Sequence, residues 1–111
     1  MRISTITLAL LVFAATARPV RAQDAAKGAQ VYAAQKCSVC HSIAGKGNAK
    51  GPLDDVGGKL TADEIREWIV DPAAMTTKQK ATRKPAMPAK YASIPKADQD
   101  ALVAYLASLK K

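Results

Sequence analysis

The chain has 111 residues, the length of one small domain. It carries 17 Lys and Arg against 9 Asp and Glu, a formal net charge of +8, and only 5% of its residues are aromatic. A basic chain with so few stacking side chains, and without a dense Lys/Arg cluster, does not fit a nucleic-acid-binding protein.

The first 22 residues have the layout of a secretory signal peptide. Residues 3–17 are apolar apart from small hydroxyl side chains, and small-x-small cleavage patterns end at Ala17 and Ala22. We therefore expect residues 1–22 to be removed and residues 23–111 to form the mature domain in the periplasm. Three basic and no acidic residues leave with the peptide, so the mature net charge is +5, from 14 basic and 9 acidic residues.

A retained membrane anchor is the alternative for this segment. Arg18 and Arg21 directly after the apolar run are unusual for a signal peptide. The run is nevertheless short for a spanning helix, which needs roughly 20 apolar residues.

The segment from Asp24 to about Lys36 predicts the first helix of an all-α domain, because no sustained alternation of apolar and polar residues predicts strands. Asp24 is a suitable N-cap. Gly28 and Tyr32 are four residues apart and share a face of this helix.

Two further helices are predicted downstream. Thr61 and Glu64 have the spacing of a capping box at the start of one, with Pro72 expected to end it. The other has Pro95 in its first turn and Ser93 or Ile94 as its cap. Its apolar stripe comprises Leu102, Tyr105, Leu106 and Leu109. The buried face of the preceding helix comprises Ile65, Trp68 and Ile69.

Long loops are predicted over residues 44–59, which hold five of the six glycines, and over residues 74–95. Loops of this length are uncommon in so small a domain unless they enclose something. A mature chain of this size also builds only a marginal core by itself. The sequence therefore predicts a bound group that completes the fold.

The string CSVCH contains both cysteines, Cys37 and Cys40, and the single histidine, His41. A thioredoxin-like redox pair needs a strand–helix–strand pattern, which the sequence lacks. A structural zinc site needs four ligands, and this cluster gives three. A lone disulfide or two inert thiols is a further alternative. Cys-x-x-Cys-His is also the signature of covalent haem attachment, and on a helical turn its three side chains project to one side.

With these motifs, the mature chain resembles the class I c-type cytochromes. The similarity covers the first helix, CSVCH, the Gly51–Pro52 pair, Trp68–Pro72, Met87–Ala89 and the closing helix. It implies a cytochrome c fold of three to four short helices, with long loops wrapped around one covalently bound haem c.

The resemblance also implies residue roles. Cys37 and Cys40 would carry the thioether bonds, and His41 would be the proximal iron ligand. The carbonyl oxygen of Pro52 would accept a hydrogen bond from the outer nitrogen of His41. Trp68 would pack beside the haem, with its N–H near a propionate, although plain core packing is the alternative.

Met87 is the expected sixth ligand, with Met75 as the alternate. Met87 lies in the loop KPAMPAK, where Pro85 and Pro88 reduce the entropy cost of holding the sulfur in place. The MPA string matches the ligand motif of the family, whereas Met75 fits a core position.

The resemblance implies an electron carrier, not an enzyme, that cycles between Fe(II) and Fe(III). The alternatives are a cytochrome subunit of a dehydrogenase complex, and a haem enzyme or ligand sensor in which Met87 does not bind iron. We expect a monomer whose redox partners, such as a dehydrogenase or an oxidase, dock on the basic loop of residues 76–90. An ordinary solvated loop is the alternative for that segment.

Overall fold

The computed structural model describes residues 20–111, and side chains from Asp24 onward. The predicted signal peptide therefore lies almost wholly outside the described residues. Within them, the elements in chain order are α1 (Val20–Ala34), the 3-10 helix η1 (Cys37–Val39), β1 (Ser42–Ile43), β2 (Lys46–Gly47), α2 (Val56–Lys59), α3 (Ala62–Val70), α4 (Pro72–Lys78), the 3-10 helix η2 (Ala89–Ser93) and α5 (Lys96–Ala107). The predicted all-α class is confirmed, with a small two-stranded sheet beside the helices.

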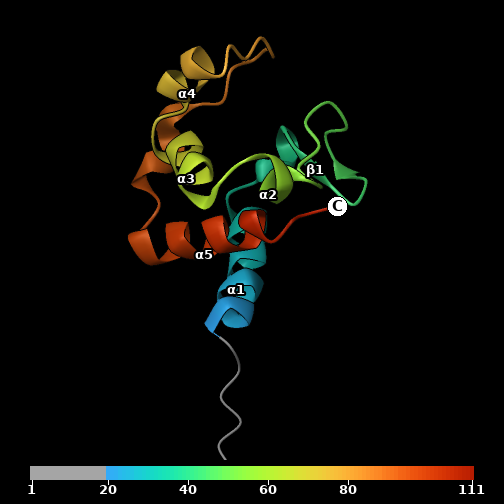
Figure 1. Cartoon of the computed structure of the whole chain (residues 1–111), viewed down its shortest axis with the longest axis vertical. Coiled ribbons are helices and arrows are strands. Elements are labelled where there is room, and N and C mark those ends of the chain that lie inside the picture. Colours follow the sequence, from blue (N-terminus) through green and yellow to red (C-terminus); the bar gives the residue numbers. More distant parts are fainter. Residues whose placement is uncertain (1–19) are drawn as a thin grey trace, which may run out of the picture.

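The core forms where α1 crosses α5 (Figure 1). A methyl group on Gly28 would overlap the carbonyl oxygen of Ala101 and the Cβ of Tyr105, so only glycine permits so close an approach. The rings of Tyr32 and Tyr105 meet edge to face with their centroids 6.1 Å apart. The buried cluster at this crossing contains Val31, Ile65, Ile69, Ile94, Leu102, Val103 and Leu106.

The helix α3 begins as predicted. The Thr61 hydroxyl accepts a hydrogen bond from the Glu64 N–H at 3.2 Å, and the Glu64 carboxylate accepts one from the Thr61 N–H at 3.0 Å. This reciprocal pair satisfies two backbone donors that the helix leaves free. The capping box is thus confirmed.

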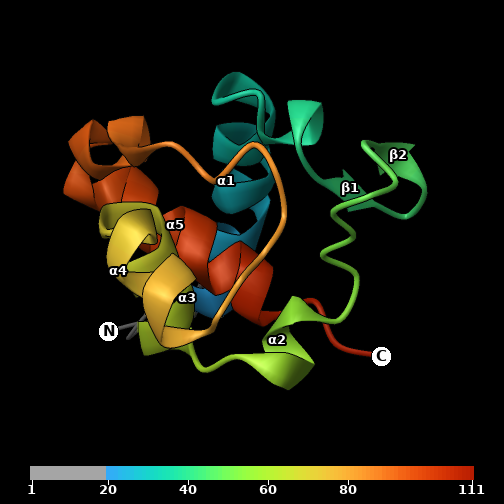
Figure 2. The ribbon, with the colours of Figure 1, turned by 90° about the horizontal axis from the view of Figure 1, so that it is seen from above.

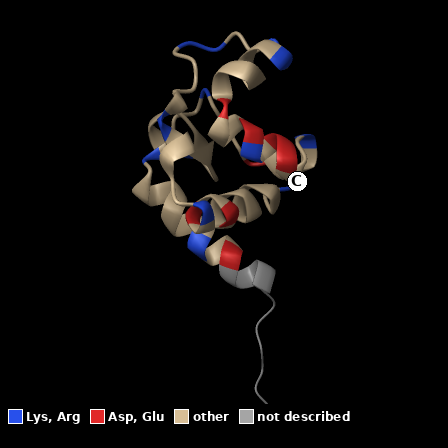
Figure 3. Ribbon diagram, turned by 90° about the vertical axis from the view of Figure 1, so that its left-hand side faces the viewer, with Lys and Arg blue, Asp and Glu red and all other residues tan. Residues whose placement is uncertain are grey.

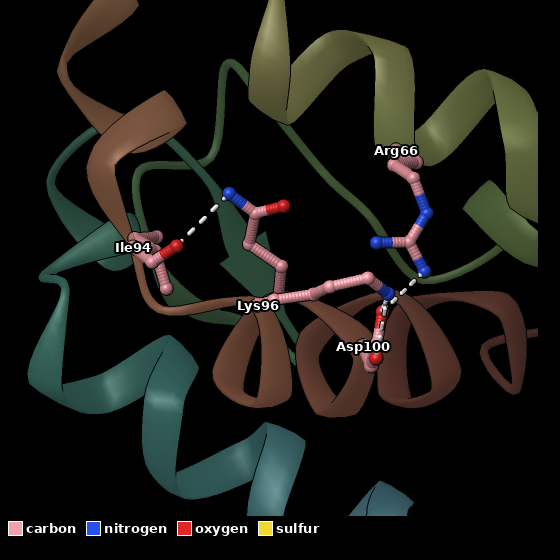
Figure 4. A network of polar contacts seen from close by, with 5 residues as sticks. Arg66, Ile94, Lys96 and Asp100 are labelled. Carbon is pink, nitrogen blue, oxygen red and sulfur yellow. Dashed lines mark hydrogen bonds and ion pairs between the residues drawn. The ribbon is translucent and has the colours of Figure 1, made fainter.

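A polar cluster joins α3 to α5 (Figure 4). The Asp100 carboxylate contacts Arg66 Nη2 at 2.8 Å and Lys96 Nζ at 3.3 Å. Beside it, the Gln99 side-chain amide donates to the carbonyl oxygen of Ile94 at 3.0 Å. These contacts fix the turn that leads into α5.

Two predicted helix boundaries are wrong, and one helix was not predicted. The first helix begins at Val20, before Asp24, so Asp24 lies inside α1 and is not its N-cap. Pro72 follows the end of α3 at Val70, as predicted, but it also opens α4, which the Asp71 carboxylate caps by accepting from the Ala74 N–H at 3.2 Å. The N-cap of α5 is Pro95, not Ser93 or Ile94.

The predicted loops also contain ordered segments. Residues 44–59 include β2 and α2, and residues 74–95 include most of α4 and all of η2. Each segment is short, so its periodicity was too weak to see in the sequence. Among the described residues, no helix has the length and apolar character needed to cross a bilayer.

Candidate functional site

The described residues line an open cavity of about 360 Å³ between the α1–α5 crossing and the loop that joins α4 to η2. Figure 2 shows that loop passing across the face of the helices. The volume lies within the range of small-molecule pockets, roughly 300–1,000 Å³. Most of its wall is apolar and includes Leu53, Val56, Leu60, Ile65, Ile69, Leu102 and Leu106.

Cys37, Cys40 and His41 all line this cavity. A left-handed residue, Lys36, turns the chain at the end of α1, and the Cys37 carbonyl oxygen accepts from the backbone N–H of Cys40 at 3.1 Å and of His41 at 2.9 Å. This single tight turn brings the three side chains to one side. The structure therefore places the string as the spacing predicts, with both cysteines as free thiols.

The Cys37 thiol does not have the character of a reactive redox thiol. Burial raises the pKa of the Cys37 thiol to about 11. Redox-active cysteines instead have lowered pKa values, which keep them as thiolates at neutral pH. In the described part of the chain, no three His, Cys, Asp or Glu side chains gather closely enough to hold a bare metal ion.

The His41 ring is oriented by a backbone carbonyl group. Its Nδ1 lies 3.1 Å from the carbonyl oxygen of Gly51, and because a carbonyl only accepts, Nδ1 carries the proton and Nε2 keeps its lone pair. Burial lowers the pKa of His41, against an opposing effect of the Gly51 bond. The ring is thus neutral and suited to bind a metal at neutral pH.

The predicted acceptor for His41 is wrong by one residue. Leu53 N–H donates to the Ser42 carbonyl at 2.8 Å, and Ser42 N–H donates to Gly51 at 3.0 Å, which forms a parallel bridge between Ser42 and Pro52. Carbonyl groups alternate in direction along an extended segment. Gly51 therefore points its carbonyl toward His41, and Pro52 does not.

Met75 and Met87 occupy different environments. Met87 lines the cavity from the loop between α4 and η2, whereas Met75 is only 1% exposed and packs in the core from α4. Trp68, half-buried on α3, also lines the cavity. The structure thus brings Met87 and Trp68 to the wall that holds His41 and leaves Met75 apart from it.

Two polar side chains at the cavity were not identified as site residues from the sequence. Tyr32 and Arg83 both line it, and the Tyr32 hydroxyl and the Arg83 Nε are buried without a hydrogen-bond partner. Burial raises the pKa of Tyr32 to about 12. No signal in the sequence distinguished Arg83 from the other basic residues of its loop, because its position depends on the tertiary fold.

These features fit a haem. The cavity is apolar, and it presents two thiols, a neutral imidazole and a thioether sulfur from different segments. The unpartnered Tyr32 hydroxyl and Arg83 Nε are suitable partners for the polar edge of such a group, because buried polar atoms are normally hydrogen-bonded. The residues present could therefore hold it covalently and ligate its iron.

Comparisons with known proteins agree with this interpretation. The chain is 47% identical to cytochrome c2 of Blastochloris viridis, over 62% of this chain and 70% of that protein. It is also 34% identical to cytochrome c oxidase subunit 2 of Alkalihalophilus pseudofirmus, over 76% of this chain but only 25% of that much longer subunit. No solved structure matched. The cytochrome c family model matches residues 25–110, nearly the whole described chain, and the protein therefore belongs to the cytochrome c family of haem-based electron carriers.

Proposed function

We propose that the protein is a periplasmic one-electron carrier with a single haem c attached through Cys37 and Cys40. His41 and Met87 would ligate its iron. The observation that carries the proposal is that one apolar cavity collects both thiols, the imidazole and the Met87 sulfur. When bound, the haem supplies an iron that changes between the ferrous and ferric states.

The surrounding residues favour electron transfer over substrate chemistry. With His41 and Met87 both bound, no open coordination position remains for a substrate. Gly51 fixes the His41 ring, and the apolar wall excludes water and disfavours the more highly charged ferric form. A thioether ligand also favours the ferrous state. The protein would therefore carry electrons without catalysing a reaction itself.

The spectrum of the purified protein tests this proposal. We expect a pyridine haemochrome of the two-thioether type and, in the ferric form, the weak long-wavelength band of methionine-bound iron. Met87→Ala should lose that band and Met75→Ala should keep it. A high-spin ferric spectrum with rapid cyanide binding in the wild type would favour the ligand-sensor alternative instead.

We further propose that acidic redox partners dock beside the cavity on the basic loop of residues 76–90. This segment contains no acidic residue, and the ribbon at the top of Figure 3 carries blue positions but no red ones. Lys80, Lys84 and Lys90 are exposed, whereas Lys78 is paired with Glu67 at 3.6 Å. Lys90 is near enough to Cys37 to lower its pKa, although burial raises it more.

An oxidase is one candidate acceptor. A permanently bound dehydrogenase subunit remains the alternative. Gel filtration of native extract distinguishes a free carrier from a subunit, and N-terminal sequencing of the periplasmic protein tests cleavage after Ala22.

A further inference from the structure

Arg83 connects two walls of the cavity. It belongs to the loop that carries Met87, but a methyl group placed on Gly51 would overlap Arg83 Nη1 and the carbonyl oxygen of Cys40. The guanidinium group therefore packs directly on Gly51. Gly51 is also the residue whose carbonyl oxygen holds the His41 ring, at 3.1 Å from Nδ1. Through this contact the Met87-bearing loop packs against Gly51, the residue that orients the His41 ring.

The Arg83 guanidinium lies against the residue that holds the His41 ring, and no carboxylate side chain of the described residues pairs with it. No Asp or Glu within residues 24–111 forms an ion pair with Arg83, and its Nε is buried without a partner. A partly buried charge is screened by salt far less than an exposed lysine.

We propose that Arg83 is a positioning residue that fastens the Met87-bearing loop to Gly51 and holds a positive charge beside His41. This inference rests on the proposed function, because it assigns Arg83 a role toward the iron ligands. A fixed positive charge at this point disfavours the ferric state and so raises the reduction potential. Packing on Gly51 also keeps the loop, and with it the Met87 sulfur, in place.

The haem-loaded protein tests both parts of the inference. Arg83→Gln removes the charge, Arg83→Lys keeps the charge without the planar guanidinium, and Lys50→Gln removes an exposed charge next to Gly51 in the sequence. Arg83→Gln should lower the midpoint potential several times more than Lys50→Gln, and Arg83→Lys should keep most of the wild-type value. In both Arg83 variants the methionine band should be lost on heating well before the far-ultraviolet circular dichroism signal.

Two kinds of failure can be told apart. Equal potential shifts in Arg83→Gln and Lys50→Gln would overturn the proposed role of the charge and leave the proposed function intact. If Arg83→Gln does not fold, Arg83→Lys carries the test, and loss of its methionine band at the wild-type temperature would overturn the loop contact. A wild-type protein without attached haem would overturn the proposed function and the inference together.

Discussion

At His41, three effects together set the protonation state of the ring. Burial, the largest effect, lowers its pKa, the Gly51 bond partly opposes this, and the charge of Arg83 lowers the pKa further. The net result is a neutral imidazole with its proton on Nδ1. A metal can bind to such a ring at neutral pH without first displacing a proton.

The buried Met75 gives a prediction at the residue scale. Met75→Ala removes a side chain that is 1% exposed, and such truncations cost roughly 2–5 kcal/mol of unfolding free energy. Val70→Ala is the control, because Val70 is 43% exposed and its truncation should cost far less. Denaturant unfolding measures both variants. A midpoint for Met75→Ala equal to that of Val70→Ala would show that Met75 is not a core residue.

The residues of the site were only partly predictable from the sequence. The CSVCH string has a fixed local geometry, so Cys37, Cys40 and His41 could be placed together in advance. The acceptor for His41 was missed by one position, because the direction of a carbonyl depends on how Ser42 pairs with Pro52. Arg83 was missed because only the folded loop brings it to Gly51.

Among the elements, α3 and α5 are joined by the exposed Asp100 cluster. The hydrogen bond from Arg66, followed by the smaller contribution of Lys96, lowers the pKa of Asp100. A carboxyl group whose pKa is lowered by folding stabilises the protein above its usual pKa of about 3.9. This contribution is lost as the pH falls through the value in the folded protein.

We therefore predict a pH-dependent effect of Asp100→Asn. Thermal unfolding should show the variant less stable than the wild type near neutral pH, with the difference shrinking as the pH falls below about 4. Asp63→Asn is the control, since Asp63 is exposed on α3 and has no ion pair in the described part of the chain. A constant difference between Asp100→Asn and the wild type across this pH range would contradict the prediction.

Long elements with strong local signals were predicted, and short ones were not. The capping box of α3 and the apolar stripe of α5 are visible in sequence alone. By contrast, β1, β2 and α2 have two to four residues each, too few to show a period. Their geometry depends on tertiary contacts, such as the Gly57 N–H that donates to the Leu109 carbonyl at 2.8 Å.

For the molecule as a whole, the cavity has a large effect on the free energy of unfolding. Leaving about 360 Å³ unfilled would cost up to about 9 kcal/mol, at roughly 24 cal/mol per Å³. This is an upper bound, because the cavity opens to solvent. Small domains are stable by only about 5–15 kcal/mol, so the loss is comparable with the entire stability of the fold.

If Cys37 and Cys40 attach the haem, as proposed, losing both should therefore unfold most of the chain. We predict that a variant with both Cys37→Ala and Cys40→Ala, expressed with the haem-attachment machinery, loses most of its helical circular dichroism signal. Ser38→Ala, at an exposed position between the two cysteines, is the control and should be indistinguishable from the wild type. A double variant with the wild-type helical signal would show that the protein folds without the group.

The basic loop predicts how electron transfer depends on salt. With an acidic redox protein as partner, the bimolecular rate should fall as ionic strength rises, because exposed charges are screened over about 8–10 Å. Lys80→Gln and Lys84→Gln should reduce both the rate at low salt and the steepness of this dependence. Lys59→Gln, exposed on α2 and outside the loop, is the control. A rate unaffected by salt would leave the loop without a role in docking.

Because α1 packs on α5, a chain that emerges from its N-terminal end cannot complete this crossing until its last helix is available. Val31 finds its partners Leu102 and Leu106 only after some seventy further residues have followed. Until then the wall around Cys37 and Cys40 is incomplete. If a haem is attached through these thiols, as proposed, attachment before the final helix packs would meet a more open site.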